Sequence, residues 1–130
     1  MNEPRRAIFP ENGPGPGGPF SSLIVANGFA FVAGQVGRVF RTNVSAGDTI
    51  EAQTRQVLDN IGLLLRAAGC GFEDVVKVNA YLTKPEFFKA FNTIYQEYFP
   101  EPRPVRTTVA AALMAPDLLV EVDVIARLPD

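Results

Sequence analysis

Three polar residues interrupt apolar stretches near the C-terminal end of the chain. Arg106 opens a strand-like run directly after the segment EPRP, whereas Glu121 and Asp123 alternate with valines. An arginine guanidinium can bind a carboxylate through two parallel hydrogen bonds, and a carboxylate can orient or deprotonate a water molecule. The same alternation is typical of the solvent face of a one-sided sheet. The pattern alone leaves both interpretations open, and Arg106 has the stronger functional case.

Two further polar side chains, Asn92 and Cys70, lie at positions that indicate a function less clearly. Asn92 sits among aromatic residues of a predicted helix, where a half-buried amide needs a hydrogen-bond partner; the alternative is an exposed position beside the aromatic residues. Cys70 follows the end of a predicted helix, so no helix N-terminus lowers its pKa. We interpret Cys70 as structural or incidental.

The residue types that the chain lacks exclude several chemistries. It has no histidine and one cysteine, which excludes Ser-His-Asp and Cys-His catalysis, histidine-based metal sites and an internal disulfide. We therefore expect no metal site. The formal net charge of −2 provides no basic field for a phosphate backbone, which argues against a nucleic-acid partner.

Length and composition predict a small soluble protein. The chain has 130 residues, of which 47% are hydrophobic and 20% charged, as in one globular domain. Residues 1–19 contain five prolines and four glycines and are predicted to be an irregular arm before a single domain at 20–130. No apolar run reaches membrane-spanning length, and a lone cysteine suits a reducing compartment. We expect a cytoplasmic protein with no membrane partner.

The first half of the domain reads as a hairpin followed by a helix. Asn27-Gly28 between two apolar runs predicts a type I′ turn within residues 22–34, with both faces of the strands covered and Gly34 ending the second strand. Apolar residues spaced three and four apart predict a helix from about 50 to 68. Asp48 is expected to cap it, and Gly69 to follow its end.

The second half predicts a strand at 74–82, a helix at about 84–99 capped by Thr83, and strands at 105–113 and 118–128. The order β-β-α-β-α-β-β indicates an α+β fold with two helices packed on one sheet. If the last two strands formed a hairpin, Arg106 and Glu121 would lie roughly 13 Å apart. One ligand could not span that distance, so either the register differs or the two residues serve one site from different subunits.

Several segments resemble one known family. EAQTRQVLDNIGLLLRAAGCGFEDVVKVNAYLT, FNTIYQEYF, PVRTTV, LLVEVDVIA and FVAGQ occur in the order seen in the Rid family, also called the YjgF or RidA family of reactive-intermediate deaminases, over about residues 18–128. The resemblance implies a mixed sheet with two helices, as in chorismate mutase of the trimeric type. It also implies a homotrimer with sites in the clefts between subunits, which suits the large apolar surface of so small a chain.

The resemblance also implies an activity and its residues. Family members hydrolyse enamines and imines to 2-keto acids and ammonia without a cofactor. By similarity, Arg106 binds the carboxylate of a small-molecule substrate and Glu121 positions the attacking water. Gly34, with Gln35 beside it, lines the pocket, and Asn92 matches a family asparagine.

The chain departs from the family archetype at three positions of the expected pocket. It has Phe20 in place of a tyrosine, Ala33 in place of a serine and Thr108 in place of a cysteine. A pocket with fewer hydroxyl groups is more apolar and suits a larger or aromatic-derived imine. Two other functions compete: a trimer that binds a small carboxylate without turnover, and a ribonuclease, which the acidic charge argues against.

Overall fold

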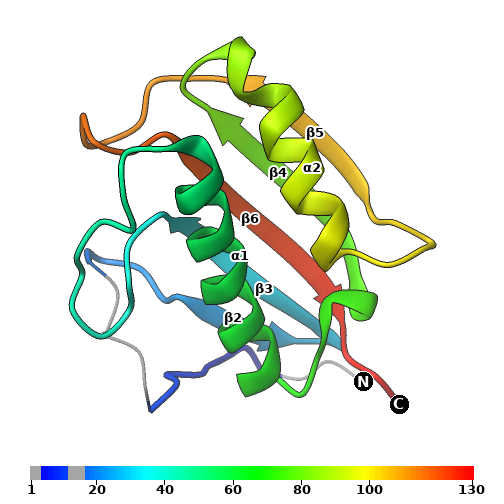
Figure 1. The fold of residues 1–130 in the computed structure, drawn as a ribbon. Helices are drawn as coiled ribbons and strands as arrows, with labels where there is room; N and C mark the ends of the chain where they lie inside the picture. The colour runs from blue at the N-terminus through cyan, green and yellow to red at the C-terminus, as the bar shows by residue number, and fades with distance from the viewer. Residues whose placement is uncertain (1–3, 12–16) are drawn as a thin grey trace.

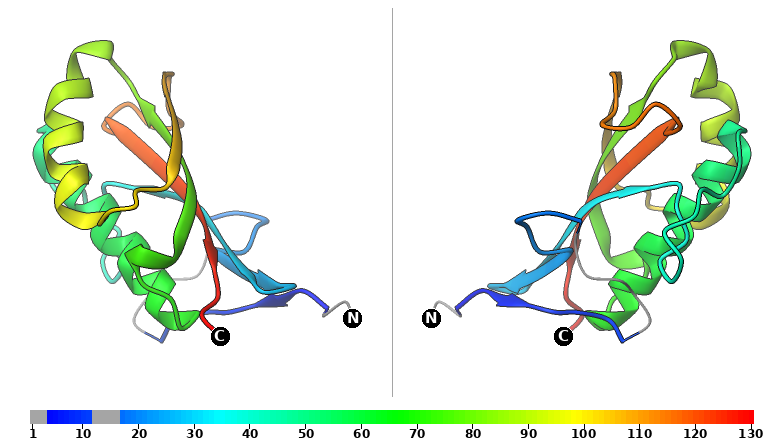
Figure 2. Two further views of the ribbon diagram at one scale, coloured as in Figure 1. Left: turned by 90° about the vertical axis from the view of Figure 1, so that its right-hand side faces the viewer. Right: turned by 90° about the vertical axis from the view of Figure 1, so that its left-hand side faces the viewer.

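The structure, a computed structural model, describes residues 4–11 and 17–130 as two layers (Figure 1). Both helices cover one face of a six-stranded sheet, and the other face carries no helix (Figure 2). The elements are β1 (Arg6–Ala7), β2 (Leu23–Ala26), β3 (Phe29–Val36), α1 (Ile50–Ala67), β4 (Val75–Leu82), α2 (Phe88–Tyr98), β5 (Val105–Ala110) and β6 (Val120–Arg127), with 3-10 turns at Phe72–Asp74 and Pro85–Phe87. The predicted α+β class with two helices on one mixed sheet is confirmed.

The strand order differs from a chain of hairpins. The order is β1-β2-β3-β6-β4-β5, and β4 and β5 pair in parallel while every other pair is antiparallel. The considered hairpin between the last two strands is therefore wrong, because β4 lies between them. The reason is the helix α2, which carries the chain back over the sheet and returns it parallel to β4. Residues 6–7 of the predicted irregular arm form an edge strand, and residues 12–16 lie outside the described part.

The first hairpin turns as predicted, but its strands are covered on one face only. Asn27 has φ 50° and Gly28 has φ 83°, the two left-handed residues that a type I′ turn requires. In β3, Phe29 and Phe31 point to the face without helices and are 38% and 42% exposed. Coverage of both faces is thus wrong for the single chain. The strand also continues past Gly34 to Val36.

The helix starts differ from the predictions by small shifts. Thr49, and not Asp48, caps α1, because its hydroxyl accepts a hydrogen bond from the amide of Ala52 at 3.1 Å. Gly69 follows the end of α1 with φ 81°, as predicted. Thr83 caps nothing: its hydroxyl donates to the carbonyl of Leu119 at 3.4 Å. A 3-10 turn leads into α2 instead.

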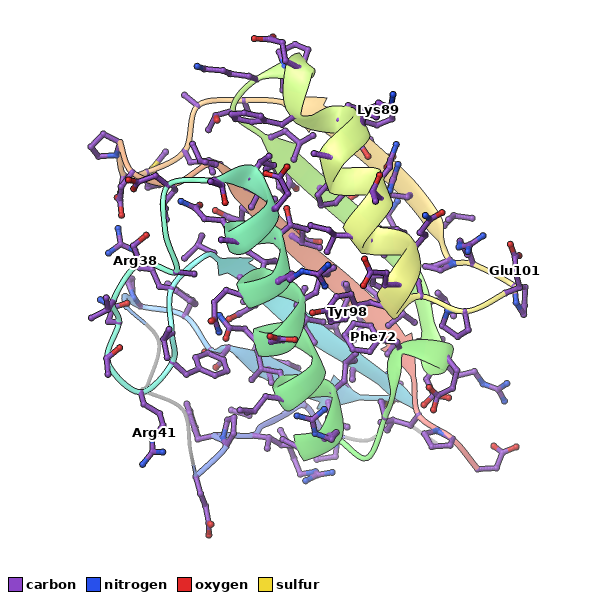
Figure 3. The ribbon with its side chains drawn as sticks, in the orientation of Figure 1. Arg38, Arg41, Phe72, Lys89, Tyr98 and Glu101 are labelled. Atoms are coloured by element: carbon purple, nitrogen blue, oxygen red, sulfur yellow. The ribbon has the colours of Figure 1, made fainter. Side chains whose placement is uncertain are left out.

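The core lies between the two helices and the sheet. Phe91 and Tyr95 of α2, and Phe99 directly after it, belong to this core: Phe91 and Phe99 are fully buried and Tyr95 is 5% exposed. The rings of Tyr95 and Phe99 stack with centroids 4.3 Å apart. Phe72 and Tyr98 meet edge to face beside α1, as Figure 3 shows. α2 lies over β4 and β5 (Figure 1), and its rings at Phe91 and Tyr95 face the side chain of Arg106 on β5.

Candidate functional site

Arg106 lies on the helix-covered face of the sheet. It pairs with the buried Val78 of β4, and neighbouring residues in register point to the same face. Its guanidinium donates a hydrogen bond to the side-chain oxygen of Asn92 at 2.8 Å. The guanidinium carbon also lies 4.5 Å from the ring centroid of Tyr95 and 5.5 Å from that of Phe91. The partner that Asn92 needed is therefore Arg106, and α2 orients the guanidinium by one amide and two rings.

The positive charge of Arg106 has no carboxylate partner within the described part of the chain. The ion pairs there involve other arginines: Arg38 with Asp117, Arg55 with Glu97, and further pairs at Arg103 and Arg127. A guanidinium has five N–H donors, and the Asn92 oxygen engages a single nitrogen. The group is held in place but keeps donors for an anionic ligand.

A shallow groove continues from Arg106 along β5. It has a volume of about 310 Å³, and its lining carries no charged side chain: Leu82, Pro85, Phe88, Thr108, Val109 and Ala110. Phe88 connects the two features, since its ring centroid lies 5.7 Å from the guanidinium carbon of Arg106. Thr108 follows Arg106 by two residues and therefore lies on the same face. A carboxylate bound at Arg106 could place an apolar substituent in this groove.

Glu121 lies on the opposite face of the sheet, which no helix covers. Its partners in register are Tyr81 on β4 and Val36 on β3. The pairing of β3 with β6 shifts between Val32 and Gln35, and this bulge brings Gly34 against the glutamate. A Cβ atom at Gly34 would lie 2.9 Å from Cδ of Glu121, which is closer than packed atoms allow. The close approach expected at Gly34 is therefore made by the Glu121 carboxylate.

The electrostatics of Glu121 make it a candidate acid and base. Among the described residues none donates a hydrogen bond to its carboxylate. Burial raises the pKa of Glu121, and the neighbouring charge of Asp123 raises it further. Asp123, in contrast, accepts hydrogen bonds from the Asn79 amide at 3.0 Å and from the Tyr81 hydroxyl at 3.2 Å. A raised pKa makes the Glu121 carboxylate a stronger base than an ordinary glutamate.

A second pocket, of about 240 Å³, lies in front of Glu121. It is lined by Tyr81, Ala111, Ala112, Leu113, Met114, Glu121 and Asp123. The polar residues Asn79 and Tyr81 were missed at the sequence level. A signal existed, because they alternate with buried Val78 and Ala80 in the run DVVKVNAYL.

Arg106 and Glu121 of one chain cannot bind the same small ligand. Arg106 pairs with Val78, three residues before the Tyr81 that pairs with Glu121, and the two residues lie two strands apart. At about 3.3 Å per residue and about 4.8 Å per strand, their Cα atoms are roughly 14 Å apart. They also face opposite sides of the sheet. The chain thus presents two half-sites: the Arg106 half-site, with its groove, and the Glu121 half-site, with its pocket.

The remaining predicted residues, Gln35 and Phe20, line neither the groove nor the pocket. Gln35 is 7% exposed, and its amide donates to the carbonyl of Ala33 at 3.0 Å, across the bulge that carries Gly34. Phe20 is 54% exposed and precedes β2. Several charged residues labelled in Figure 3, Arg38, Arg41, Lys89 and Glu101, belong to neither half-site. In the part of the chain that is described, no group of three or more acidic, cysteine or histidine residues could hold a metal ion.

Comparison with known proteins assigns the family. The model of the family described as Endoribonuclease L-PSP matches residues 10–128. A Rid family protein from Yersinia pestis has a solved structure that is 34% identical, with a TM-score of 0.90 and coverage of 96% of this chain and 100% of that chain. The chain belongs to the Rid family. The expected resemblance is confirmed.

Rid relatives carry several functional descriptions. A RutC family protein of Pyrococcus horikoshii is 42% identical over 94% of this chain and 97% of its own length. Reactive Intermediate Deaminase A of Arabidopsis thaliana is 36% identical over 95% of this chain and 66% of its own length. The Rid family thus includes reactive-intermediate deaminases. Within residues 4–11 and 17–130, neither helix is both long and apolar enough to cross a membrane.

Proposed function

We propose that this protein hydrolyses the enamine and imine forms of 2-amino acids to 2-keto acids and ammonia. The observation that carries the proposal is the pair of half-sites. One holds an arginine oriented by Asn92 with no carboxylate partner in the described chain, and the other holds a carboxylate, Glu121, without a described donor. Membership of a family that includes a reactive-intermediate deaminase supports it.

The active assembly in this proposal is a homotrimer whose sites lie between subunits. Arg106 of one subunit and Glu121 of its neighbour would face one cleft, because a single chain presents them on opposite faces. The face without helices also exposes large apolar side chains that an assembly would cover: Phe29, Phe31, Val105 and Val109. Sedimentation at micromolar concentration should give three times the monomer mass, and a monomer would contradict this assembly.

Arg106 would act by binding the substrate carboxylate through two parallel hydrogen bonds. The contacts with Asn92 and the α2 rings hold the guanidinium in place, which limits the entropy lost when it binds. Imines of this kind already hydrolyse in water, so the protein needs to supply only a modest acceleration. Holding the carbon–nitrogen double bond next to a water molecule can supply most of it.

Glu121 would position that water and remove its proton as the oxygen attacks the carbon of the protonated imine. The electron pair of the C=N bond moves to nitrogen, which gives a carbinolamine. Nitrogen then takes that proton back from Glu121. The hydroxyl proton passes to Glu121 as the C–N bond breaks, and the keto acid and ammonia leave. The raised pKa of Glu121 suits it to this exchange of protons. Arginine, glutamate and water suffice, so the reaction needs no cofactor.

The preferred substrate would carry an apolar side chain. The groove next to Arg106 is lined by uncharged residues, among them the half-exposed side chains of Phe88 and Val109. Phe20 and Ala33 bring no hydroxyl group to the expected pocket. Imines derived from leucine or phenylalanine should therefore be hydrolysed faster than the smallest imino acids.

A coupled assay tests the proposal. An amino-acid oxidase generates a panel of imines, and their decay and ammonia release are followed with wild-type protein, with Arg106→Ala and without protein. The wild type should accelerate the decay of at least the apolar imines, and Arg106→Ala should not. Equal decay rates in all three samples would end the enzymatic assignment.

One relative favours a second candidate function. A protein of Lactococcus lactis that is 34% identical over 85% of this chain is described as a candidate regulator, AldR. The Arg106 half-site could hold a small carboxylate without turnover. Tight binding of a carboxylate by calorimetry, with no ammonia release from any imine of the panel, would favour this binding function.

A further inference from the structure

Asp123 is a polar residue of β6 that the proposed hydrolysis does not use. It points to the same face as Glu121, two residues away, and borders the same 240 Å³ pocket. Its two carboxylate oxygens have separate donors: Asn79 donates to Oδ1 at 3.0 Å and Tyr81 to Oδ2 at 3.2 Å. Both donors come from β4, a central strand of the sheet. Asp123 is therefore a fixed charge, whereas the Glu121 carboxylate has no described donor to hold it.

We propose that Asp123 is a positioning residue of the site, whose fixed negative charge lets the Glu121 carboxyl group both take a proton from the attacking water and return it to the departing nitrogen. The inference rests on the proposed imine hydrolysis. Asp123 touches neither substrate nor water in this scheme and acts through Glu121 alone.

The surroundings of Glu121 single out Asp123 as the charge that matters. From β4, Tyr81 faces Glu121 with a neutral hydroxyl, and Lys77 lies four residues further along, about 13 Å away. Gly34 and Val36 on β3, Val109 on β5 and the apolar residues of segment 111–114 bring no charge. Arg38 follows Val36 by two residues, and its charge is paired with that of Asp117 at 2.8 Å. Of these charges, that of Asp123 is the one that acts on Glu121, and it raises the pKa of the Glu121 carboxyl group. A negative charge there disfavours a second one on Glu121 and strengthens the Glu121 carboxylate as a base.

Glu121 handles a proton at two steps of the proposed hydrolysis, and the charge of Asp123 affects both. A protonated imine and water give a keto acid and an ammonium ion. Glu121 takes one proton when the water oxygen bonds to carbon, and it must give that proton to the carbinolamine nitrogen before the C–N bond breaks. As that bond breaks, the hydroxyl group passes its proton to Glu121, and the released ammonia takes it up as ammonium. A carboxyl group with an ordinary pKa stays ionised and is a weak base toward water. The charge of Asp123 improves the first of these steps and keeps the proton on Glu121 until nitrogen takes it.

The test compares wild type with Asp123→Asn, which keeps the side-chain shape and removes the charge. Carbon-13 NMR of labelled glutamate carboxyls gives the titration midpoint of Glu121, and imine hydrolysis gives the pH profile of kcat/KM. Asp123→Asn should lower the Glu121 midpoint by about 0.5–1 pH unit and move the acid limb of the profile down by the same amount. At neutral pH kcat should fall roughly threefold to tenfold.

Glu51→Gln is the matched control, since it removes one negative charge at an exposed position of α1. It should leave the Glu121 midpoint and the profile unchanged. An unchanged Glu121 midpoint in Asp123→Asn overturns the inference even if the wild type is an active deaminase. A uniform loss of activity at every pH with an unmoved acid limb does so too, because it marks a structural role. A shifted midpoint in a protein that hydrolyses no imine defeats the proposed function and, with it, the catalytic use of the coupling.

Discussion

The charged groups of the two half-sites lie in opposite environments: Arg106 has partners in its own chain, and Glu121 lies beside a like charge. Arg106 is surrounded by partners within its own chain: Asn92 accepts its hydrogen bond, and the rings of α2 face its charge. Glu121 is pressed against Gly34 at a bulge, next to a second carboxylate, and receives no hydrogen bond from a described residue. The chain stabilises the charge of Arg106 through its own side chains and gives the charge of Glu121 no such support from the described residues.

This difference suits the roles that we propose for the two groups. A binding arginine gains from a fixed geometry, because the entropy of ordering it is lost on folding and not on binding. A carboxylate that transfers protons gains from weak solvation, because hydrogen-bond donors would lower its pKa and make it a poorer base. The helix-covered face supplies the first environment, and the bulged strand on the open face supplies the second.

The largest expected effect comes from Arg106→Lys. Lysine keeps the charge but replaces the planar fork by a point donor, and it loses the geometry that Asn92 and the α2 rings hold. Loss of the bidentate contact should cost about 2–5 kcal/mol of transition-state binding, measured as kcat/KM in the coupled imine assay. Thermal melting of the same variant is the control, and it should change little. Full activity in Arg106→Lys would contradict the carboxylate-binding role.

Mixing two inactive variants tests whether the half-sites meet between subunits. Arg106→Ala and Glu121→Gln should each be inactive alone. When they are co-refolded in equal amounts, about a quarter of the sites of a random trimer receive the intact arginine from one subunit and the intact glutamate from the next. Activity should return to about that fraction of wild type. A mixture that stays inactive, while native mass spectrometry shows mixed trimers, would contradict a site shared between subunits.

Gly34→Ala tests the close approach at the bulge. The new Cβ atom meets the Glu121 carboxylate, which must move, so kcat should fall by roughly tenfold while substrate affinity changes less. Gly17→Ala is the matched control, because a Cβ atom there meets nothing within 4 Å. An active Gly34→Ala protein would show that the position of Glu121 does not limit the reaction.

The smallest effect concerns stability. Burial raises the pKa of Glu121 in the folded chain, so the folded state binds a proton more tightly than the unfolded state and loses stability as pH rises through that pKa. Glu121→Gln should therefore raise the unfolding free energy at neutral pH by about 0.5 kcal/mol, discounted for partial exposure. The gain should vanish below the ordinary pKa of a glutamate. Denaturant melts at the two pH values measure it, and a destabilised variant at neutral pH would contradict the assignment.

Local patterns were enough to predict most of the elements. The Asn27-Gly28 turn needs two left-handed residues, and the apolar spacing of α1 needs a buried stripe; both requirements are local and both were met. The helix starts were less accurate, since Asp48 and Thr49 are both good caps by type. Thr49 caps α1 because its hydroxyl reaches the amide three residues further on. The hydroxyl of Thr83 instead donates a hydrogen bond to the carbonyl of Leu119, which is distant in sequence.

The sequence by itself determined the fold class and nominated Arg106, Glu121 and Asn92, because residue types that break an apolar pattern are visible along the chain. Only the tertiary structure decided how they relate. Because β5 pairs in parallel with β4, Arg106 lies under α2 and donates a hydrogen bond to Asn92. Glu121 on β6 points to the opposite face of the sheet. Strand order depends on how the whole chain packs its apolar surface, and no local pattern encodes it. That order separates the two charges within one chain.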